Sequence, residues 1–528
     1  MATREQVVES WERLDHNIGR VAAELGISRS GVYHHLQKAG KKRPEMRGKV
    51  EERRTIRFTR PPKGEVRRYI LSSAQNNTKP NARVWANLLE LADFYGAEVL
   101  LGSITYDVSS YGASKVKRGQ EKSESEGGPS WDPELRPYLR DDRIELAPGL
   151  VWCGEVNILP TAKNDPATTE TYTQRASGIF PHPKFAMDAI PSNKGEATKF
   201  NWTTGAVTQR NYIQKKAGQI AEFHHGYGAL LVEVDHRGEW WVRQLNADSD
   251  GRIYDLDVVV EDGAVYENED GVEAITWGDI HSLALDPKVA AACWGPGGTL
   301  DSLKPTHQFF HDILLGTRIN HHEWKNFHEQ LRLVRDGHHL VGVELDDAAS
   351  FLKMADRDWV DSVVVYSNHD DPWLTRWLNE TDYRKDPANA ETFLELQLAK
   401  VRAINGGGDV NLLELAMTER GVDGIRFLGC DESFLICRKR IECGQHGHLG
   451  PNGAKGTPLG LSKMGRKSNT AHTHSPGIVD GQYVAGTCTT LDMRFNRGPS
   501  SWSHSHVVTY PNGKRAIVTV WKGKWRAE

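Results

Sequence analysis

Five short segments between residues 274 and 476 carry carboxylate, imidazole and amide side chains, which are common ligands of divalent metals. The first segment, residues 274–281, is an apolar run that ends in Asp279 and His281. In a β-strand, residues two apart lie on the same face, so both side chains can bind one metal ion. The sequence therefore predicts a metal site at the end of this run.

Four later segments carry the same kinds of side chain. They contain, in chain order, Asp312, then Asn368, His369 and Asp370, then His446 and His448, and then His472 and His474. A single Asp-x-His or His-x-His pattern indicates little, because such pairs are frequent on protein surfaces. The five segments together, in this order, are much more specific.

This order resembles the signature of the calcineurin-like metallophosphoesterases, over roughly residues 272–495, a little under half of the chain. The resemblance implies an α/β fold, the α/β/β/α sandwich of that superfamily, with a dinuclear metal centre. By position, one metal would be held by Asp279, His281 and His474, the second by Asn368, His446 and His472, and both by Asp312. His369 would not bind metal but would protonate or steady the leaving oxygen, and Asp370 would orient His369.

The chain departs from the family pattern at two positions. His311 precedes the bridging Asp312 and Ala471 precedes His472, where the family usually has glycine, but neither change removes a ligand. Two alternatives stay open. His448 could replace His446, although the position after an apolar run favours His446. A second His-x-His pair, His504 and His506, fits the fifth segment less well, because Pro476 and the Gly-rich stretch after it match the family pattern better.

Mixed carboxylate, imidazole and amide ligands suit two divalent ions. We expect Mn²⁺, with Mg²⁺, Fe²⁺ or Zn²⁺ as alternatives. Two such ions lower the pKa of a water and neutralise charge that develops on a phosphoryl group. The expected reaction is therefore hydrolysis of a phosphoester without a covalent intermediate on the protein.

The N-terminal segment Ile18–Leu36 resembles the helix-turn-helix of bacterial regulators and transposases. Gly26 allows a turn with positive φ, Ser28 is a natural N-cap, and Val32 and Leu36 are core positions of a second helix. That helix would present to a DNA major groove the side chains of Arg29, Ser30, Tyr33, His34 and Lys38. The alternative is a helical hairpin used only for protein contacts.

A strongly basic stretch follows this segment. From Lys38 to Arg68 the chain has 13 Lys or Arg and 4 Glu, a local net charge of +9 in a protein with a net charge of −4. Pro61 and Pro62 indicate a stiff connector. Such a stretch favours sequence-independent, salt-sensitive contacts with DNA phosphates, and it makes the helical hairpin alternative less attractive.

Length and composition frame these elements. The 528 residues predict several domains: a helix-turn-helix domain 1–43, a basic linker 44–68, an α/β domain 69–262 of unknown role, a catalytic domain 272–500 and a C-terminal β-hairpin 501–528. The hydrophobic fraction of 38% is enough for real cores. Mean hydropathy is −0.56, and no run of about 18 apolar residues predicts a membrane span. With only six cysteines, we expect a cytoplasmic protein.

The predicted function combines these parts. A DNA-binding segment and a basic linker raise the local concentration of DNA near the metals, which favours a DNA nuclease. The site resembles that of the SbcD-type repair nucleases, and the overall arrangement resembles phage-encoded metallophosphoesterases that degrade host DNA, which places the protein in the host cytoplasm. Expected partners are DNA and further copies of the chain, with no membrane. Alternatives are a DNA-binding regulator with a nucleotide phosphodiesterase domain, or a protein phosphatase.

Overall fold

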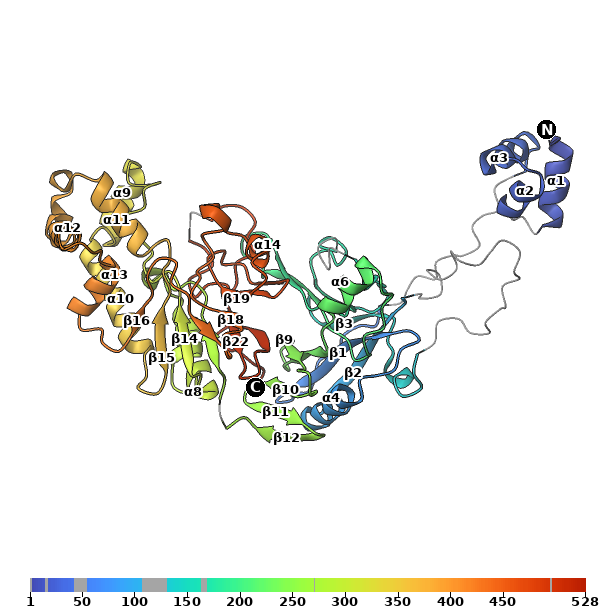
Figure 1. Cartoon of the computed structure of the whole chain (residues 1–528), viewed down its shortest axis with the longest axis horizontal. Coiled ribbons are helices and arrows are strands. Elements are labelled where there is room, and N and C mark those ends of the chain that lie inside the picture. The colour runs from blue at the N-terminus through green and yellow to red at the C-terminus, as the bar shows by residue number, and fades with distance from the viewer. Residues whose placement is uncertain are drawn as a thin grey trace. The chain divides into compact units, whose positions relative to one another are not determined.

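The computed structural model describes residues 2–14, 18–41, 55–106, 131–162, 169–269, 271–493 and 496–528. The chain forms two compact units, residues 1–54 and 55–528 (Figure 1). Residues 44–54 of the predicted basic linker lie outside the described residues. The remainder of that linker leads into the first strand of the larger unit.

The N-terminal unit contains three described helices, α1 (Arg4–Arg13), α2 (Ile18–Glu24) and α3 (Arg29–Lys38). They enclose a small core of five buried side chains, Val7, Trp11, Val21, Val32 and Leu36. The side chain of Ser28 accepts a hydrogen bond from the N–H of Gly31 and so caps α3. Gly26 has a φ of 65°, the left-handed turn that the sequence predicts between α2 and α3.

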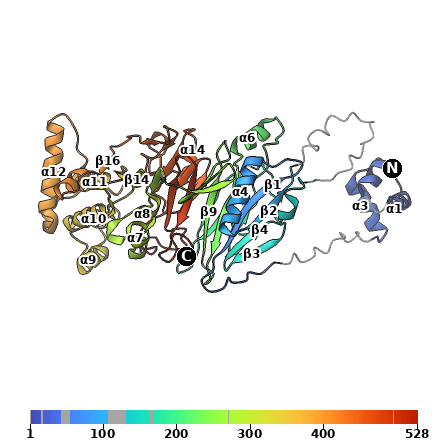
Figure 2. The same ribbon diagram turned by 90° about the horizontal axis from the view of Figure 1, so that it is seen from below.

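The larger unit begins with a four-stranded sheet. Its order is β2 (Glu98–Ile104), β1 (Arg67–Gln75), β8 (Gly228–Val234), β9 (Trp240–Asn246). β1 and β2 are parallel and are joined by α4 (Ala82–Tyr95), so the three elements form a βαβ unit. Figure 2 shows α4 lying across these strands. A small antiparallel sheet contains β10 (Ile253–Asp255), β11 (Val258–Glu261) and β12 (Ala264–Glu267). It packs against α4 in a hydrophobic core that also includes residues of the four-stranded sheet.

A six-stranded sheet lies at the centre of the predicted catalytic region. Its order is β16 (Arg426–Phe427), β15 (Asp361–Val364), β14 (His307–Phe310), β13 (Ala274–Thr276), β22 (Ser505–Thr509), β23 (Arg515–Thr519). The first four strands are parallel. β22 and β23 form the predicted C-terminal hairpin, but β22 pairs with β13, so the hairpin is part of this sheet.

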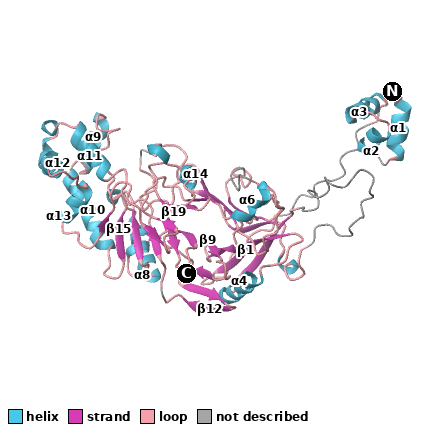
Figure 3. Ribbon diagram, in the orientation of Figure 1, coloured by secondary structure: helices cyan, strands magenta, loops and turns pink. Residues whose placement is uncertain are grey.

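Alternation of side chains along these strands gives the sheet two buried faces. Ile275, Phe310 and Val364 point into a core with the helices α7 (Pro287–Trp294), α10 (Val341–Ala355), α11 (Asp371–Glu380) and α13 (Leu412–Glu419). Their neighbours Phe309 and Val363 point the other way, into a core shared with the segments around β17 and β18. The sheet is therefore covered by helices on one face and by strands on the other. Helices α8 (Thr299–Leu303), α9 (Phe327–Asp336) and α12 (Ala390–Asn405) belong to the same region, and Figure 3 shows the helices gathered beside the sheet.

The third large sheet has ten strands. Their order is β17 (Leu435–Ile436), β18 (Ile441–Glu442), β19 (Lys467–Thr470), β21 (Gln482–Val484), β20 (Gly477–Val479), β6 (Met187–Ile190), β7 (Lys199–Thr203), β5 (Ser177–Phe180), β4 (Leu150–Cys153), β3 (Arg143–Ala147). β20 pairs with β6, so this sheet joins ranges that the sequence divides into 69–262 and 272–500. The two ranges also share one apolar core, in which Met187 and Trp202 lie with Ile478 and Tyr483.

The protein is thus of the mixed α/β class, with several sheets and helices. Two further helices of the larger unit are α6 (Lys216–His224) and α14 (Pro458–Ser462). Among the described residues, no helix is both long enough and apolar enough to cross a membrane.

Candidate metal centre

The parallel strands β13, β14 and β15 bring three of the five segments to one edge of the six-stranded sheet. Asp279 and His281 follow β13, Asp312 follows β14, and Asn368 follows β15. The carboxyl ends of adjacent parallel strands meet at one edge, where side chains from different strands converge. The other two segments follow β18 and β19, which are also parallel to each other.

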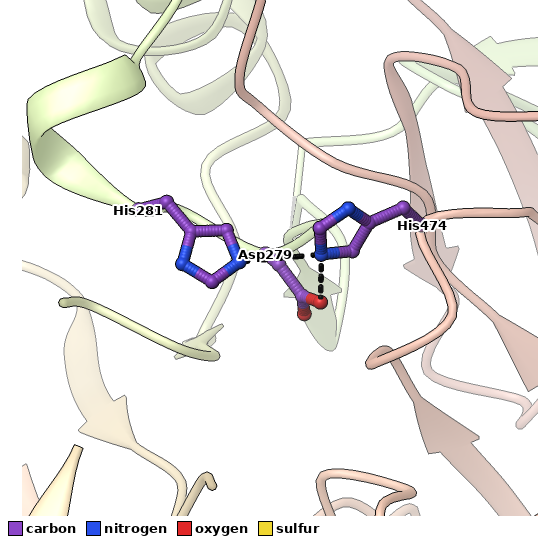
Figure 4. Close-up of side chains that lie close together, drawn as sticks. All are labelled: Asp279, His281 and His474. Atoms are coloured by element: carbon purple, nitrogen blue, oxygen red, sulfur yellow. Dashed lines mark hydrogen bonds and ion pairs between the residues drawn. The ribbon is translucent and has the colours of Figure 1, made fainter. Parts of the chain in front are cut away.

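Asp279, His281 and His474 form the first group of side chains in the centre, and all three are buried (Figure 4). The Nε2 of His474 lies 2.8 Å from Oδ2 of Asp279 and 3.2 Å from Nε2 of His281. Nδ1 of His281 lies 2.7 Å from the carbonyl oxygen of Leu314, which can only accept a hydrogen bond. Nδ1 therefore carries the proton, and in the neutral ring Nε2 presents a lone pair to the group.

Asp312 and His446 anchor the second group, which also contains His472. Nε2 of His446 lies 3.2 Å from Oδ2 of Asp312 and 3.0 Å from Oδ1 of Asn368. The same Asp312 oxygen lies 4.0 Å from Nε2 of His281, so it faces both groups. The backbone N–H of His472 donates to Oδ1 of Asp279 at 3.1 Å. Asp312 thus occupies the position between the groups that a bridging ligand requires.

The titration of these groups reflects two buried carboxylates beside several imidazoles. Burial opposes ionisation of Asp279, but the neighbouring His446 and His474 hold its pKa below its usual value. Burial likewise opposes charge on His446, yet the carboxylates of Asp312 and Asp279 raise its pKa to about 9. Burial lowers the pKa of His281 to about 3. The buried, ionised carboxylates are therefore stabilised by nearby positive charge. His281 is neutral, as a metal ligand must be.

His369 lies beside His281, with ring centres 4.7 Å apart, and is only partly buried. Its Nδ1 donates to the carbonyl oxygen of Leu315 at 2.9 Å, so Nε2 carries the lone pair of the neutral ring. Its ring stacks on Trp373, with ring centres 3.7 Å apart. Its backbone N–H donates to Oδ1 of Asp312 at 2.9 Å. His369 also forms a ligand-like group with His281 and Asp312, so the geometry allows it to bind metal as well as to act as an acid.

Among the described residues, no hydrogen bond joins the carboxylate of Asp370 to the ring of His369, and the orienting role that the resemblance implies stays a prediction. Oδ1 of Asp370 accepts the backbone N–H of Leu314 at 2.9 Å. The carbonyls of Leu314 and Leu315 hold the rings of His281 and His369. Hydrogen bonds through this backbone segment thus link Asp370 to both rings.

Four of the predicted ligands have left-handed backbone conformations. The φ angles are 43° at His281, 43° at Asp312, 73° at His472 and 57° at His474. Such conformations are unfavourable for residues with a Cβ and persist where the surrounding structure imposes them, often at functional sites. The turns also correct one expectation: Asp279 and His281 lie beyond the end of β13, and a turn rather than strand alternation brings them together.

The chain is 37% identical over 476 residues to protein A1 of Escherichia phage T5, and the match covers 87% of this chain and 83% of the relative. The chain belongs to the family of this phage protein. The A1 relationship supports the bacteriophage origin that the sequence predicts. No protein-family model matches the sequence, and no solved structure matches it.

The structure shows where the alternative metal ligands left open by the sequence lie. His446, rather than His448, belongs to the group with Asp312 and His472. The His448 ring lies beside it, with ring centres 5.3 Å apart. His504 and His506 do not join the described ligand groups: Nε2 of His504 lies 2.7 Å from the Thr489 carbonyl, and Nδ1 of His506 accepts from Gly278.

Sequence reasoning treated His311 only as a departure from the family pattern, but the side chain is fully buried. Its Nδ1 lies 3.3 Å from Nδ1 of His446, and the two rings stack. A ring in place of the usual glycine was the available signal for His311. No signal in the sequence identified the carbonyls of Leu314 and Leu315.

The donor set fits divalent metals. Two carboxylates, an amide oxygen and several imidazole nitrogens converge, and the lone pair of His281 faces a ring nitrogen of His474. Nitrogen and oxygen ligands of this kind suit Mn²⁺, Fe²⁺ or Zn²⁺. These buried groups are suited to bind metal ions, without fixing their number or identity.

The predicted DNA-binding residues lie on α3 of the N-terminal unit. Ser30, Tyr33, His34 and Lys38 are exposed, while Val32 and Leu36 face the core. The side chain of Arg29 lies outside the described part of the structure. The described side chains thus leave one polar face of α3 accessible.

Proposed function

We propose that this protein is a metal-dependent nuclease that hydrolyses phosphodiester bonds of DNA with two divalent ions, and that its catalytic region is a metallophosphoesterase sandwich. The observation that carries the proposal is the position of Asp312, whose Oδ2 faces His281 on one side and His446 on the other. A sheet with helices on one face and strands on the other is consistent with that sandwich.

Each group of this chain then has a role in the reaction. Asp279, His281 and His474 would hold one ion, Asn368, His446 and His472 the other, and Asp312 both. Bound ions of this kind lower the pKa of water and neutralise charge on a phosphodiester. His369 holds its ring by Nδ1, and its Nε2, once protonated, can deliver that proton to the leaving oxygen.

The choice of DNA as substrate rests on the N-terminal unit. An exposed polar face on α3, followed by the basic stretch, would bring a polyanion to the metal centre. Phage origin is consistent with an enzyme that acts on host DNA in the host cytoplasm.

The test is a comparison of substrates with the full chain. Plasmid, linear DNA, bis-p-nitrophenyl phosphate and p-nitrophenyl phosphate are incubated with the protein in Mn²⁺ or in EDTA. We expect cleavage of DNA and of the diester in Mn²⁺ only. Preference for p-nitrophenyl phosphate with intact DNA would instead indicate a monoesterase, and cleavage in EDTA would contradict the metal mechanism.

A further inference from the structure

A hollow of about 930 Å³ opens in the larger unit between β7, β9 and the segments before and after the C-terminal hairpin. Its wall contains several indole rings; we call it the Trp groove and define it by Trp202, Trp240, Trp502 and Trp521. The volume is at the upper end of the range of small-molecule sites, about 300–1,000 Å³. No residue of the predicted metal centre lines it.

The Trp groove nevertheless adjoins the metal centre. The ring of Trp502 packs against the ring of His474, with ring centres 4.1 Å apart. The next residue, Ser503, donates its backbone N–H to the carbonyl of His474 at 3.2 Å. A ligand that reaches across Trp502 would therefore lie in both sites.

Two indole rings of the Trp groove, those of Trp240 and Trp521, are held in place by their own N–H groups. Nε1 of Trp240 donates to the carbonyl of Pro148 at 3.1 Å, and Nε1 of Trp521 donates to Glu239. Trp202 packs edge-on against Trp240, with ring centres 6.0 Å apart. Rigid indoles whose polar atoms are already bonded offer flat apolar faces, on which any base can stack.

Cations without a carboxylate partner lie at the rim of the Trp groove. Arg60 and Arg237 are exposed, line the hollow and form no ion pair with other described residues. Lys522 differs, because it pairs with Glu239. An apolar pocket with unpaired guanidinium groups at its rim complements a ligand that combines flat bases with phosphates.

We propose that the Trp groove binds an unpaired nucleotide of the DNA strand whose phosphodiester lies at the metal centre. The inference rests on the proposed nuclease function and specifies its substrate: a strand end or a locally opened strand rather than an intact duplex. Base stacking on Trp240 and Trp521 and phosphate contacts with Arg60 and Arg237 hold the nucleotide, while Trp502 separates it from the metal ligands.

The experiment measures binding apart from hydrolysis. Binding of fluorescein-labelled tetrathymidylate to the full chain is followed by anisotropy in EDTA, for wild type, Trp240→Ala, Trp240→Phe and the double variant Arg60→Gln/Arg237→Gln. Trp359→Ala is the matched control, because Trp359 is 47% exposed and does not line the hollow. Hydrolysis of bis-p-nitrophenyl phosphate in Mn²⁺ is measured for each variant.

We expect Trp240→Ala and the double Arg variant to weaken tetrathymidylate binding about tenfold, and Trp240→Phe to restore most of it. A blunt duplex should compete poorly, and hydrolysis of the small diester should stay within twofold of wild type. The double Arg variant keeps the test informative if Trp240→Ala does not fold.

Failure of the inference differs from failure of the proposed function. If wild type hydrolyses the diester but all variants bind tetrathymidylate equally, the inference is wrong and the nuclease proposal stands. If no variant changes binding but Trp240→Ala changes the oligomeric state, the groove is an interface between copies, which also overturns the inference. If wild type does not hydrolyse the diester in Mn²⁺, the function itself fails.

Discussion

The α3 face and the metal centre both gather polar side chains, but they do so in different ways. On α3, exposed Ser30, Tyr33, His34 and Lys38 come from one helix, with the apolar residues behind them. In the metal centre, the polar groups come from segments distant in the chain and most are buried. A helix face needs only local sequence, whereas the metal centre exists only when both large sheets are formed. Recognition and chemistry should therefore be separable by mutation.

The largest expected effect is loss of chemistry at the bridging position. Asp312→Asn removes the charge that faces both groups, so hydrolysis of bis-p-nitrophenyl phosphate should fall about a thousandfold or more. Duplex binding measured by anisotropy should stay unchanged. Asp358→Asn is the control, because Asp358 is exposed and precedes β15, at the opposite end of the strand from the centre. Residual activity near that of wild type would remove Asp312 from the mechanism.

The second expected effect tests whether His369 acts as an acid or as a ligand. His369→Gln removes the proton donor, so kcat for a substrate with a poor leaving group should fall about a hundredfold to ten-thousandfold. Mn²⁺ content, measured by atomic emission on the purified protein, should equal that of wild type. Exposed His338→Gln is the control. Loss of Mn²⁺ in step with activity would show that His369 is a ligand instead.

Many residues of the metal centre could be predicted from the sequence, because each ligand follows a short apolar run. Asp312 follows Phe309 and Phe310, and Asn368 follows a run of valines. The end of each predicted strand is therefore close in sequence to a polar residue. The core of the N-terminal unit was equally accessible, since Val32 and Leu36 are spaced four apart on one helix face.

Other features could not be predicted, because they depend on contacts between distant parts of the chain. The pairing of β20 with β6 joins two ranges that local periodicity separates. Leu314 and Leu315 act through backbone carbonyls, which carry no residue-type signal. The hydrogen bond between the carboxylate of Asp370 and the N–H of Leu314 likewise joins segments far apart in the sequence.

A third test concerns the buried scaffold behind the centre. Glu344 of α10 is 4% exposed, and its carboxylate accepts the backbone N–H of Gly316 at 2.5 Å. Burial raises its pKa from 4.5 to about 7, although the N–H groups of Gly316 and Leu315 oppose the rise. The folded state thus favours the protonated form. Its contribution to stability is complete below about pH 4.5 and is lost as the pH rises through 7, by about 3 kcal/mol.

Glu344→Gln should remove this dependence, because the amide stays neutral and still offers an oxygen to the two N–H groups. The midpoint of thermal unfolding of the variant, relative to wild type, should therefore rise between pH 5.5 and pH 8. Exposed Glu414→Gln on α13 is the control and should follow wild type at both pH values. A difference between Glu344→Gln and wild type that does not change with pH would contradict the assigned protonation.

The smallest expected effect is that of removing the N-terminal unit, which carries the α3 face. Deletion of residues 1–54 removes one compact unit and leaves the other, so hydrolysis of bis-p-nitrophenyl phosphate should be unchanged. Duplex affinity should fall about tenfold at low salt, and the slope of its logarithm against the logarithm of salt concentration should become shallower, because phosphate contacts are lost. In the full chain, His34→Ala with Lys38→Ala should give part of this loss, whereas Glu24→Ala should not. Equal affinity and slope with and without the unit would mean that the larger unit alone binds DNA, and the exposed face of α3 would then need a different ligand.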